Sequence, residues 1–422
     1  MSNFGNVELN SVNVKQLTGL VVLFYLGLAF FASLPFMLCG VLNPVDAYVE
    51  GMGMVTTTGV TLVGIDELPG MFILWRSVME WLGGFLALVL FALLLPRVVH
   101  QPIYAANREL GDCTDWHSLP GWYTTLRMLS LFYLAVTVLV DLGLMCFGLN
   151  GFDAANFALT LVSTGGLSGV NTFTAWQLSN GLKIFMALVM LVAGGNYFWY
   201  YFVVTGQVGK IIRDVQFRAY LGGTVVAVLL LWLSGKCFGN QSESLVNIIC
   251  QVTSCLSSTG YVFVNSAHLS GFAYLVLATL VFVGGCAGSP AGGMKISRVV
   301  LSWKLVDCNV RSVYRPHLVQ QVEYNGKRLP NESLGYVSLF FFAYVVMIML
   351  VGLCLAAEGL APVDALVTAV GLVSNTGSMF DLSCVSWFTK LVMTFGMLAG
   401  RLEILSMLLV FLPEFWQRKS RW

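Results

Sequence analysis

Four Thr-Gly pairs are the residues of this chain whose types and spacing point most directly to chemistry. Each follows a short apolar stretch, and successive pairs lie roughly a hundred residues apart, which indicates a fourfold internal repeat. They are Thr58-Gly59, Thr164-Gly165, Thr259-Gly260 and Thr376-Gly377. Backbone carbonyls beside such a glycine can replace the hydration shell of an ion, because glycine accepts positive φ and lets the carbonyl direction reverse. One pair alone would be an ordinary turn, but four in register predict the filter of an ion pore.

The residues before each pair predict the element that positions it. Directly before each pair stands a residue that can hydrogen-bond locally and hold the loop: Thr57, Ser163, Ser258 and Asn375. Further upstream, 12 or 13 residues before each glycine, stands a residue type that favours a helix start: Asp46, Asp153, Asn247 and Asp364. A helix of about twelve residues is only about 18 Å long and cannot cross about 30 Å of hydrocarbon. We therefore expect four half-helices whose carbonyl ends, which carry partial negative charge, point inward to the ion.

Composition places these elements in a bilayer. With 57% hydrophobic and only 10% charged residues, the chain is too apolar for a soluble domain. Eight apolar stretches are long enough to span a membrane as helices: 17–40, 71–96, 124–148, 181–206, 219–237, 270–294, 334–357 and 385–412. We expect an all-α polytopic membrane protein without a soluble domain. Its first span should be retained as an anchor, since no cleavage site of a signal peptide precedes it.

The same pattern divides the chain into repeats. Each repeat holds an apolar span, a half-helix, a Thr-Gly pair and a second apolar span, and the four cover residues 17–97, 123–210, 218–300 and 333–413. Most of the 22 Lys and Arg residues lie near the two ends or between repeats, so the segments 1–16 and 414–422 should both be cytoplasmic.

The opposite side is acidic, which suits a cation. Its acids are Asp46, Glu50, Asp66, Glu67, Asp153, Glu243, Glu358, Asp364 and Asp381. The four histidines lie far apart, so no histidine metal site is expected.

Five further segments are distinctive. They read WRSVMEWLGG (75–84), GGNYFWYYFVVTG (194–206), GGCAGSPAGGMKISR (284–298), RPHLVQQVEYNGKRLP (315–330) and GRLEILSMLLVFLPEFW (400–416). With the four Thr-Gly loops, they make the chain resemble the Trk/Ktr/HKT superfamily of potassium transport subunits over nearly its whole length. The resemblance is closest to the bacterial Trk membrane subunit.

The resemblance implies four pseudo-symmetric units, each an M1 helix, a pore helix and an M2 helix, around one central pore. It implies one essential glycine per filter, at Gly59, Gly165, Gly260 and Gly377, and K+ as the transported ion. In plant relatives a serine at the first of these positions goes with Na+ preference, so Gly59 favours K+. The protein would lie in the cytoplasmic membrane of a bacterium, and it would be a transporter, not an enzyme.

A second glycine-rich segment lies inside the sixth predicted span. From Gly284 to Gly293 the helix breakers are too many for an unbroken helix, although close packing against a neighbouring helix would also use small residues. The resemblance implies an intramembrane gate loop with these residues: Gly284, Gly285, Gly288, Ser289, Gly292, Gly293 and Lys295. Pro290 and Ala291 stand where the family usually has Thr and Gly.

Two arginines inside apolar stretches need partners, because a lipid-facing arginine at the bilayer centre costs about 2.5–3.5 kcal/mol on insertion scales. For Arg401 we expect a pair with Glu403 or Asp141, and the resemblance adds a role as an electrostatic barrier beside the gate. Arg76 and Glu80 are four residues apart on one helix and should form an ion pair.

Two other functions fit parts of the pattern. A Na+- or H+-coupled potassium symporter also uses repeats and broken helices. Gly166 to Gly169 spells the GxSG motif of a serine protease, which would need a histidine base such as His268.

The resemblance also implies partners. We expect a homodimer on a cytoplasmic ring of nucleotide-binding (RCK-type) regulatory subunits, docked on basic loops at Lys210–Arg218, Lys304–Arg315 and Arg418–Arg421. The chain has no nucleotide fingerprint and no cofactor of its own, and no nucleic-acid partner is expected.

Overall fold

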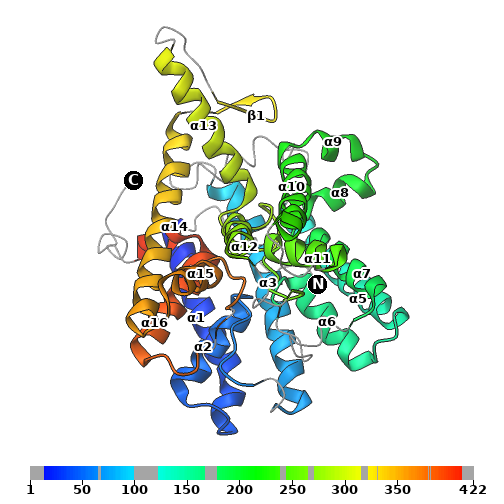
Figure 1. Ribbon diagram of the computed structural model, residues 1–422, viewed down its shortest axis with the longest axis vertical. Helices are drawn as coiled ribbons and strands as arrows, with labels where there is room; N and C mark the ends of the chain where they lie inside the picture. Colours follow the sequence, from blue (N-terminus) through cyan, green and yellow to red (C-terminus); the bar gives the residue numbers. More distant parts are fainter. Residues whose placement is uncertain are drawn as a thin grey trace, which may run out of the picture.

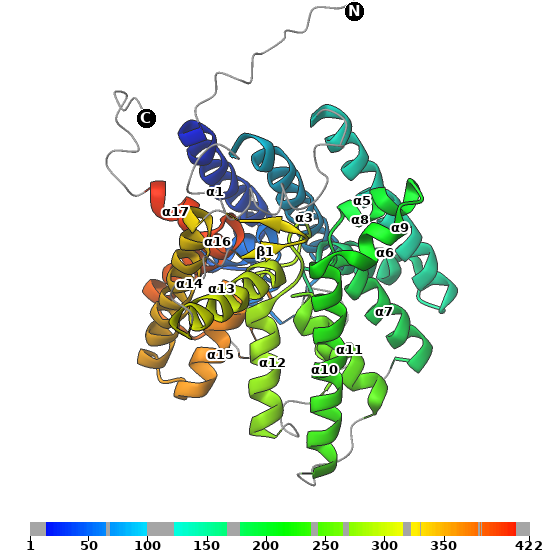
Figure 2. The same ribbon diagram turned by 90° about the horizontal axis from the view of Figure 1, so that it is seen from above.

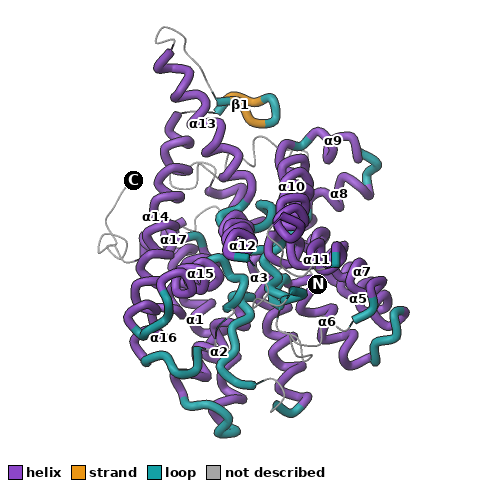
Figure 3. Tube along the Cα trace, in the orientation of Figure 1, coloured by secondary structure: helices purple, strands orange, loops and turns teal. Residues whose placement is uncertain are grey.

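The computed structural model describes residues 14–64, 68–98, 122–166, 178–237, 244–264, 270–314, 322–329, 331–378, 380 and 382–410. These residues are mostly helical (Figures 1 and 3). The only strands among them form a small antiparallel hairpin of β1 (Glu323–Tyr324) and β2 (Lys327–Arg328).

Five helices are long and apolar enough to cross a membrane. They are α1 (Val14–Leu38), α3 (Gly70–Val98), α5 (Trp122–Cys146), α10 (Val215–Cys237) and α14 (Asn331–Ala357). Large apolar side chains on them, such as Leu20, Leu139 and Phe342, are more than half exposed on the surface of the chain. An exposed apolar surface of this extent is what lipid covers. Five of the eight predicted spans are therefore single helices.

The other three predicted spans are each broken. A break was expected in 270–294, whereas the breaks in 181–206 and 385–412 correct the expectation of unbroken helices. The first consists of α7 (Asn180–Ala193) and α8 (Phe198–Val204), which are bent by 101°. The second consists of α12 (Gly271–Val283), a loop of twelve residues, and α13 (Ile296–Tyr314). The third consists of α16 (Trp387–Leu402) and α17 (Ile404–Val410), which are separated by Glu403 at φ 65°.

Four short helices match the predicted half-helices. They are α2 (Pro44–Val55), α6 (Gly151–Ser163), α11 (Leu245–Leu256) and α15 (Pro362–Val373). Each has 12 or 13 residues, too short to span. The first two are capped by Asn43 and Asn150, whose side chains accept from the backbone N–H three residues on. Asp46 and Asp153 therefore lie in the first turn, where a negative charge complements the helix dipole.

The helices group into four units, which we define as one short helix with the apolar helices on either side of it. The helix before each short helix packs against it, as α1 does on α2. The helix after each short helix packs against the short helix of the next unit: α3 on α6, α7 on α11, α12 on α15 and α16 on α2. In Figure 2 the chain accordingly runs round the molecule in sequence order. The contact of α16 with α2 joins the last unit to the first.

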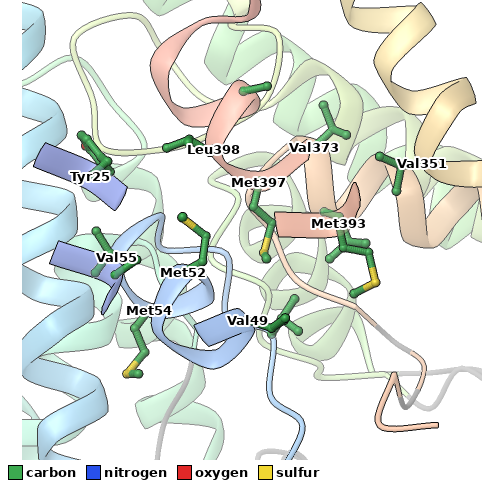
Figure 4. Close-up of a cluster of buried hydrophobic side chains, with 14 of the residues drawn as sticks. Tyr25, Val49, Met52, Met54, Val55, Val351, Val373, Met393, Met397 and Leu398 are labelled. Carbon is green, nitrogen blue, oxygen red and sulfur yellow. The ribbon is translucent and has the colours of Figure 1, made fainter. Parts of the chain in front are cut away.

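The hydrophobic core is densest where that ring closes. Figure 4 shows Met52 and Val55 of α2 in one cluster with Met393 and Met397 of α16. All four side chains are fully buried. Truncating a buried methionine to alanine typically costs about 2–5 kcal/mol, so this junction contributes substantially to the fold.

Candidate functional site

Directly after each short helix the backbone makes the same turn. One residue in each loop has a positive φ although it carries a side chain: Thr57 (54°), Thr164 (57°), Ser258 (54°) and Asn375 (52°). Two residues later comes a glycine that also has a positive φ: Gly59 (71°), Gly166 (77°), Gly260 (81°) and Gly377 (109°). A non-glycine residue held in this region costs about 1–3 kcal/mol. The same strain at four equivalent places points to a shared task for the four loops.

The hydrogen bonds fix how the loops correspond. In each loop the residue after the first strained one donates its N–H to a carbonyl five residues back. The donors and acceptors are Thr58 to Gly53 (2.8 Å), Gly165 to Thr160 (2.9 Å), Thr259 to Ser254 (2.9 Å) and Thr376 to Gly371 (2.8 Å).

This correspondence corrects the register predicted for the second loop. Gly165 is equivalent to Thr58, and Gly166, not Gly165, is equivalent to Gly59. The loop is therefore Thr164-Gly165-Gly166, and Ser163 is the last residue of its helix. The sequence held the signal, because Gly166 stands 13 residues after Asp153, the same spacing as in the other three loops.

From the second loop onward, each loop approaches the next one closely. A β-carbon added to Gly166 would lie 1.9 Å from the carbonyl oxygen of Thr259. The same atom on Gly260 would lie 2.1 Å from the oxygen of Thr376, and on Gly377 it would lie 3.1 Å from that of Thr58. The glycine of one loop therefore faces the threonine carbonyl of the next, and the fourth loop returns to the first.

A cavity of about 180 Å³ lies where the loops meet. It is lined by the glycine of each loop, Gly59, Gly166, Gly260 and Gly377. It is also lined by Thr259 and Thr376, whose carbonyl oxygens face a glycine of another loop. The backbones of four separate chain segments thus border one space, and that space lies at the carbonyl ends of the four short helices.

Side chains behind the loops hold their shape. The hydroxyls of Thr56 and Thr58 are 2.6 Å apart, and those of Ser257 and Thr259 repeat this contact at 2.6 Å. Asn375 Nδ2 donates to Thr58 Oγ1 and to the Met397 carbonyl, both at 2.9 Å. The hydroxyls of Thr58 and Thr259 are engaged in this support, whereas those of Thr57 and Thr164 are buried without a hydrogen-bond partner among the described residues.

Two of the short helices also support the chain beyond the loop. Glu50 Oε2 accepts the N–H of Leu62 at 2.9 Å, and Gln251 Oε1 accepts that of Phe263 at 2.8 Å. Both residues stand nine positions before the loop glycine, a recurrence that the sequence analysis missed. Buried Arg76 lies 2.9 Å from Glu50. The expected pair with Glu80 is therefore wrong, because α3 turns Arg76 toward the neighbouring short helix.

Basic side chains reach the starts of two short helices. Lys390 Nζ of α16 lies 2.7 Å from Asp46 in α2, and Lys183 Nζ of α7 donates to Asn247 in α11 at 3.0 Å. Of the acids predicted to face outward, Asp46 and Glu50 are therefore paired with cations. Four others lie outside the described residues: Asp66, Glu67, Glu243 and Asp381.

The glycine-rich segment 284–295 is a buried loop at the carbonyl ends of the short helices. The N–H of Gly292 donates to Ser258 Oγ at 2.5 Å, and a β-carbon on Gly292 would lie 1.9 Å from the Ser374 carbonyl. On its other side, the loop exchanges backbone hydrogen bonds with the break between α7 and α8, through Gly194 (2.9 Å) and Tyr197 (3.0 Å). The loop thus contacts three units, and all predicted gate residues except Arg401 lie in it.

Two cations bind the carbonyls of this loop. Half-buried Arg401 donates from Nη1 to the Pro290 oxygen and from Nη2 to the Gly83 oxygen at 3.3 Å. Lys295 donates to the oxygens of Ser289 and Ala291. Arg401 therefore pairs with neither expected acid among the described residues.

Glu403, one of those expected partners, binds a different arginine. Its Oε1 lies 2.5 Å from Arg298 Nη2. Arg298 follows the glycine-rich loop by a few residues, whereas Glu403 stands at the break of α16. The sequence could not reveal this pair, since Arg298 lies 105 residues before Glu403 and comes close to it only after folding.

Four loops border one cavity, and the helices around them have apolar outer surfaces. This arrangement defines a membrane transport protein. Comparison with known proteins gives the family: the TrkH family of cation transport proteins matches residues 29–420, and this chain belongs to it.

Several relatives have been named. The Trk system potassium uptake protein TrkH of Salmonella typhimurium is 29% identical to the chain, covering 94% of it and 85% of the relative. The TrkH of Escherichia coli gives the same values. An uncharacterised cation transporter of Methanocaldococcus jannaschii is also 29% identical, over 87% of this chain and 76% of that one.

A solved structure agrees with the fold. The crystal structure of the potassium transporter TrkH from Vibrio parahaemolyticus superposes with a TM-score of 0.87 at 25% identity, covering 98% of this chain and 88% of that one. Most of the GxSG segment and His268, which a protease would need, lie outside the described residues. The family is one of transporters, which disfavours an enzyme.

Proposed function

We propose that this protein carries K+ across a bacterial cytoplasmic membrane through a filter formed by the four loops. The single observation behind the proposal is that four loops of the same backbone conformation border one cavity. Relatives named for potassium uptake share the fold and most of the chain length. In this proposal the four units are pseudo-symmetric M1, pore-helix and M2 repeats around a central pore.

The chemistry of the filter is that of oxygen ligands and helix dipoles. Each short helix ends at a loop and directs its partial negative charge toward the cavity. The carbonyl oxygens of Thr58, Thr259 and Thr376 each lie next to the glycine of another loop. These glycines are Gly377, Gly166 and Gly260, respectively. Weakly hydrated K+ can exchange its water for such oxygens, whereas a site held open by packed neighbours fits smaller Na+ less well.

The glycine-rich loop is proposed as the gate. Segment 284–293 lies against the loops of the third and fourth units through Ser258 and Ser374. Lys295 and Arg401 add two positive charges there, and positive charge at the mouth of a narrow path repels a cation. In this position the loop would obstruct the path, and opening would require it to leave the filter.

The proposed partners fit exposed parts of the described surface. Helix α13 carries Trp303, Val306, Val310 and Val313 at spacings of three and four residues, each more than half exposed. Figure 1 shows the far end of α13 projecting beyond the neighbouring helices. Such a stripe suits the seam between two helices of a homodimer. Two of the predicted basic docking loops, Lys210–Arg218 and Lys304–Arg315, are largely helical, which corrects their description as loops.

Tracer flux into liposomes tests the transport proposal. We expect uptake of K+ and Rb+ in strong preference to Na+ at a fixed voltage, without any Na+ or H+ gradient. Uptake that requires such a gradient would favour a coupled symporter. The variant Gly59→Ser should weaken the preference for K+, and equal rates and preference in that variant would refute the filter assignment.

The assembly is tested separately. We expect the purified protein to be a dimer in detergent and Val306→Glu with Val310→Glu to shift it to a monomer. The matched control is Asn309→Asp, which adds a negative charge on an exposed α13 position outside the stripe. A dimer that survives the first change would place the interface elsewhere, and nucleotide-insensitive flux in the presence of the regulatory subunit would refute that partner.

A further inference from the structure

The hairpin between α13 and α14 lies directly against the glycine-rich loop. Its strands β1 and β2 are joined by Asn325 and Gly326, both at positive φ (48° and 79°), as the tight hairpin turn requires. In Figure 2 it lies near the middle of the molecule, between α3 and α13. Lys304 Nζ of α13 donates to the Glu323 carbonyl at 2.6 Å.

One face of the hairpin is apolar and encloses part of the loop. Val322, Tyr324 and Leu329 are each at most 5% exposed, and they form one cluster with Ala287 of the loop. Leu301 of α13 and Leu334 of α14 complete that cluster. A short hairpin is only marginally stable alone, so this contact with the loop also stabilises the hairpin itself.

A polar network joins the same two parts. Asn325 donates from Nδ2 to Asp214 Oδ1 at 3.1 Å and accepts the N–H of Val215 at 3.0 Å. Asp214, 8% exposed, also accepts from Gln216 N and Trp199 Nε1, both at 3.0 Å. Gln216 Nε2 in turn donates to the Ala287 carbonyl at 3.5 Å. The chain of contacts therefore runs from the tip of the hairpin to the loop.

The Asn325 side chain does more than the turn demands. Asn, Asp and Gly all suit the first position of this turn type. Asn325 nevertheless directs both ends of its amide to a different element, the connection between α9 (Val208–Arg213) and α10. A residue that served only the turn would have no need of these two hydrogen bonds.

We infer that the hairpin is a seat that holds the gate loop in place, with the contact between Asn325 and Asp214 as its lock. The inference rests on the proposed role of segment 284–293 as the gate. When the hairpin moves away from α10, Ala287 loses its apolar neighbours Val322, Tyr324 and Leu329, and of these contacts only the hydrogen bond from Gln216 of α10 is left to hold it. A partner that pulls on the hairpin would thus release the loop without touching the filter.

Two variants of one residue test this inference while keeping the turn. Asn325→Gly removes the lock, and Asn325→Asp replaces a donor by a second carboxylate beside Asp214. We expect Rb+ flux in liposomes to rise about threefold to tenfold in the first, the range of one lost hydrogen bond or two, and more in the second. The preference for K+ over Na+ should stay unchanged, because the filter is not altered.

An exchange variant separates gating from general damage. In Asp214→Asn with Asn325→Asp, an amide again faces a carboxylate, but the amide introduced at position 214 has one oxygen for the two donors Gln216 N and Trp199 Nε1. Flux should therefore fall from the level of Asn325→Asp part of the way toward that of the wild type. Asn309→Asp, the same change of charge on exposed α13, should have no effect. If Asn325→Asp fails to yield a monodisperse protein, Asn325→Gly decides.

The outcomes distinguish the inference from the function. Unchanged flux in both Asn325 variants, while Gly292→Ala in the loop itself alters flux, would overturn the seat and leave the gate. An exchange variant whose flux is no lower than that of Asn325→Asp would also overturn it. If no variant and no wild-type protein prefers K+ to Na+, the proposed function is wrong.

Discussion

The four Thr-Gly loops and the four helices that follow them obey different rules. The loops repeat one backbone conformation, with φ angles at the first strained residue that agree within 52–57°. The following helices all differ: α3 is unbroken, α7 turns by 101° into α8, α12 gives way to a twelve-residue loop, and α16 breaks at Glu403. The four loops at the ends of the short helices therefore form a regular region with one shared conformation. The helices that follow them form an irregular region, in which the four units differ.

The difference follows from what each region would have to do. An ion surrounded by oxygens needs similar ligands on all sides, so four units are held to one geometry. A single obstruction must come from one unit, so the units cannot all be alike there. Both non-glycine residues at positive φ in these breaks are charged: Lys295 binds carbonyls of its own loop, and Glu403 pairs with Arg298 of α13.

The strongest test of the regular region is to add one methyl group to one of its four loops. In Gly166→Ala the new β-carbon would lie 1.9 Å from the Thr259 carbonyl oxygen, at φ 77°. Backbone strain and overpacking together cost about 4 kcal/mol, which corresponds to about a thousandfold loss of K+ flux. Rb+ uptake into liposomes measures the loss.

Gly377→Ala is the matched variant, in the fourth loop. Its β-carbon would lie 3.1 Å from the Thr58 oxygen, so the contact is tight but not prohibitive. We expect a loss of about tenfold, which reflects strain at φ 109° more than collision. Equal losses in the two variants would show that the spacing between loops does not control the path.

The regular region was predictable from sequence to within one residue. Thr-Gly pairs and helix-start residues recur at fixed distances, and the short helices lie where they predict. The error in the second loop arose because Gly165 and Gly166 are adjacent glycines, and the Thr-Gly dipeptide was given more weight than the 13-residue spacing from Asp153. A dipeptide match cannot show which of two glycines has the positive φ.

A second prediction concerns the buried ion pair between Glu50 and Arg76. Glu50 and Gln251 support the chain in the same way, but only Glu50 faces a buried arginine. Glu50→Gln should therefore destabilise the protein by about 3–5 kcal/mol, because Arg76 keeps its charge without a partner. A lowered thermal unfolding temperature in detergent is the measurement.

The double variant Glu50→Gln with Arg76→Met makes the first unit resemble the third. It should recover most of the stability, since an apolar side chain replaces the buried charge. A double variant as unstable as Glu50→Gln alone would mean that the ion pair, not the relief of an unpaired charge, stabilises this region.

A third prediction reverses the effect of the first with the same chemical change. In Gly292→Ala the β-carbon would lie 1.9 Å from the Ser374 carbonyl oxygen, so the glycine-rich loop could not keep its present place. Flux should rise severalfold, whereas alanine at Gly166 lowers it. A fall in flux with intact protein would show that the loop supports the filter rather than obstructing the path.

The irregular region could not be read from the sequence in the same detail. Apolar residues stand on both sides of Glu403, so the sequence does not show that the helix breaks there. Nor does it show that Glu403 pairs with Arg298. The partners of Arg76 and Arg401 were also mispredicted, because they lie on other elements: Glu50 on α2, and backbone carbonyls of the glycine-rich loop and α3. Contacts between distant segments leave no periodicity in a single sequence.

The smallest effect is expected at the exposed start of α16, which differs from the starts of α7 and α12. Ser179, Ser270 and Ser386 cap α7, α12 and α16 alike, but only Ser386 also donates to a carboxylate, that of Glu358. The hydroxyls of Ser386 and Thr389 lower the pKa of Glu358 below its ordinary value of 4.5. A carboxyl whose pKa falls on folding stabilises the fold above pH 4.5, and this contribution disappears as the pH falls through the lowered pKa.

The test compares the wild type with Glu358→Gln in thermal unfolding at pH 7 and at pH 3–4. The variant should unfold slightly earlier at pH 7, and the difference should vanish at the lower pH. Thr389→Val should reproduce part of the effect, because it removes one of the two donors to Glu358 Oε1. A difference that persists unchanged at low pH would mean that the start of α16 depends on the shape of the Glu358 side chain and not on its charge.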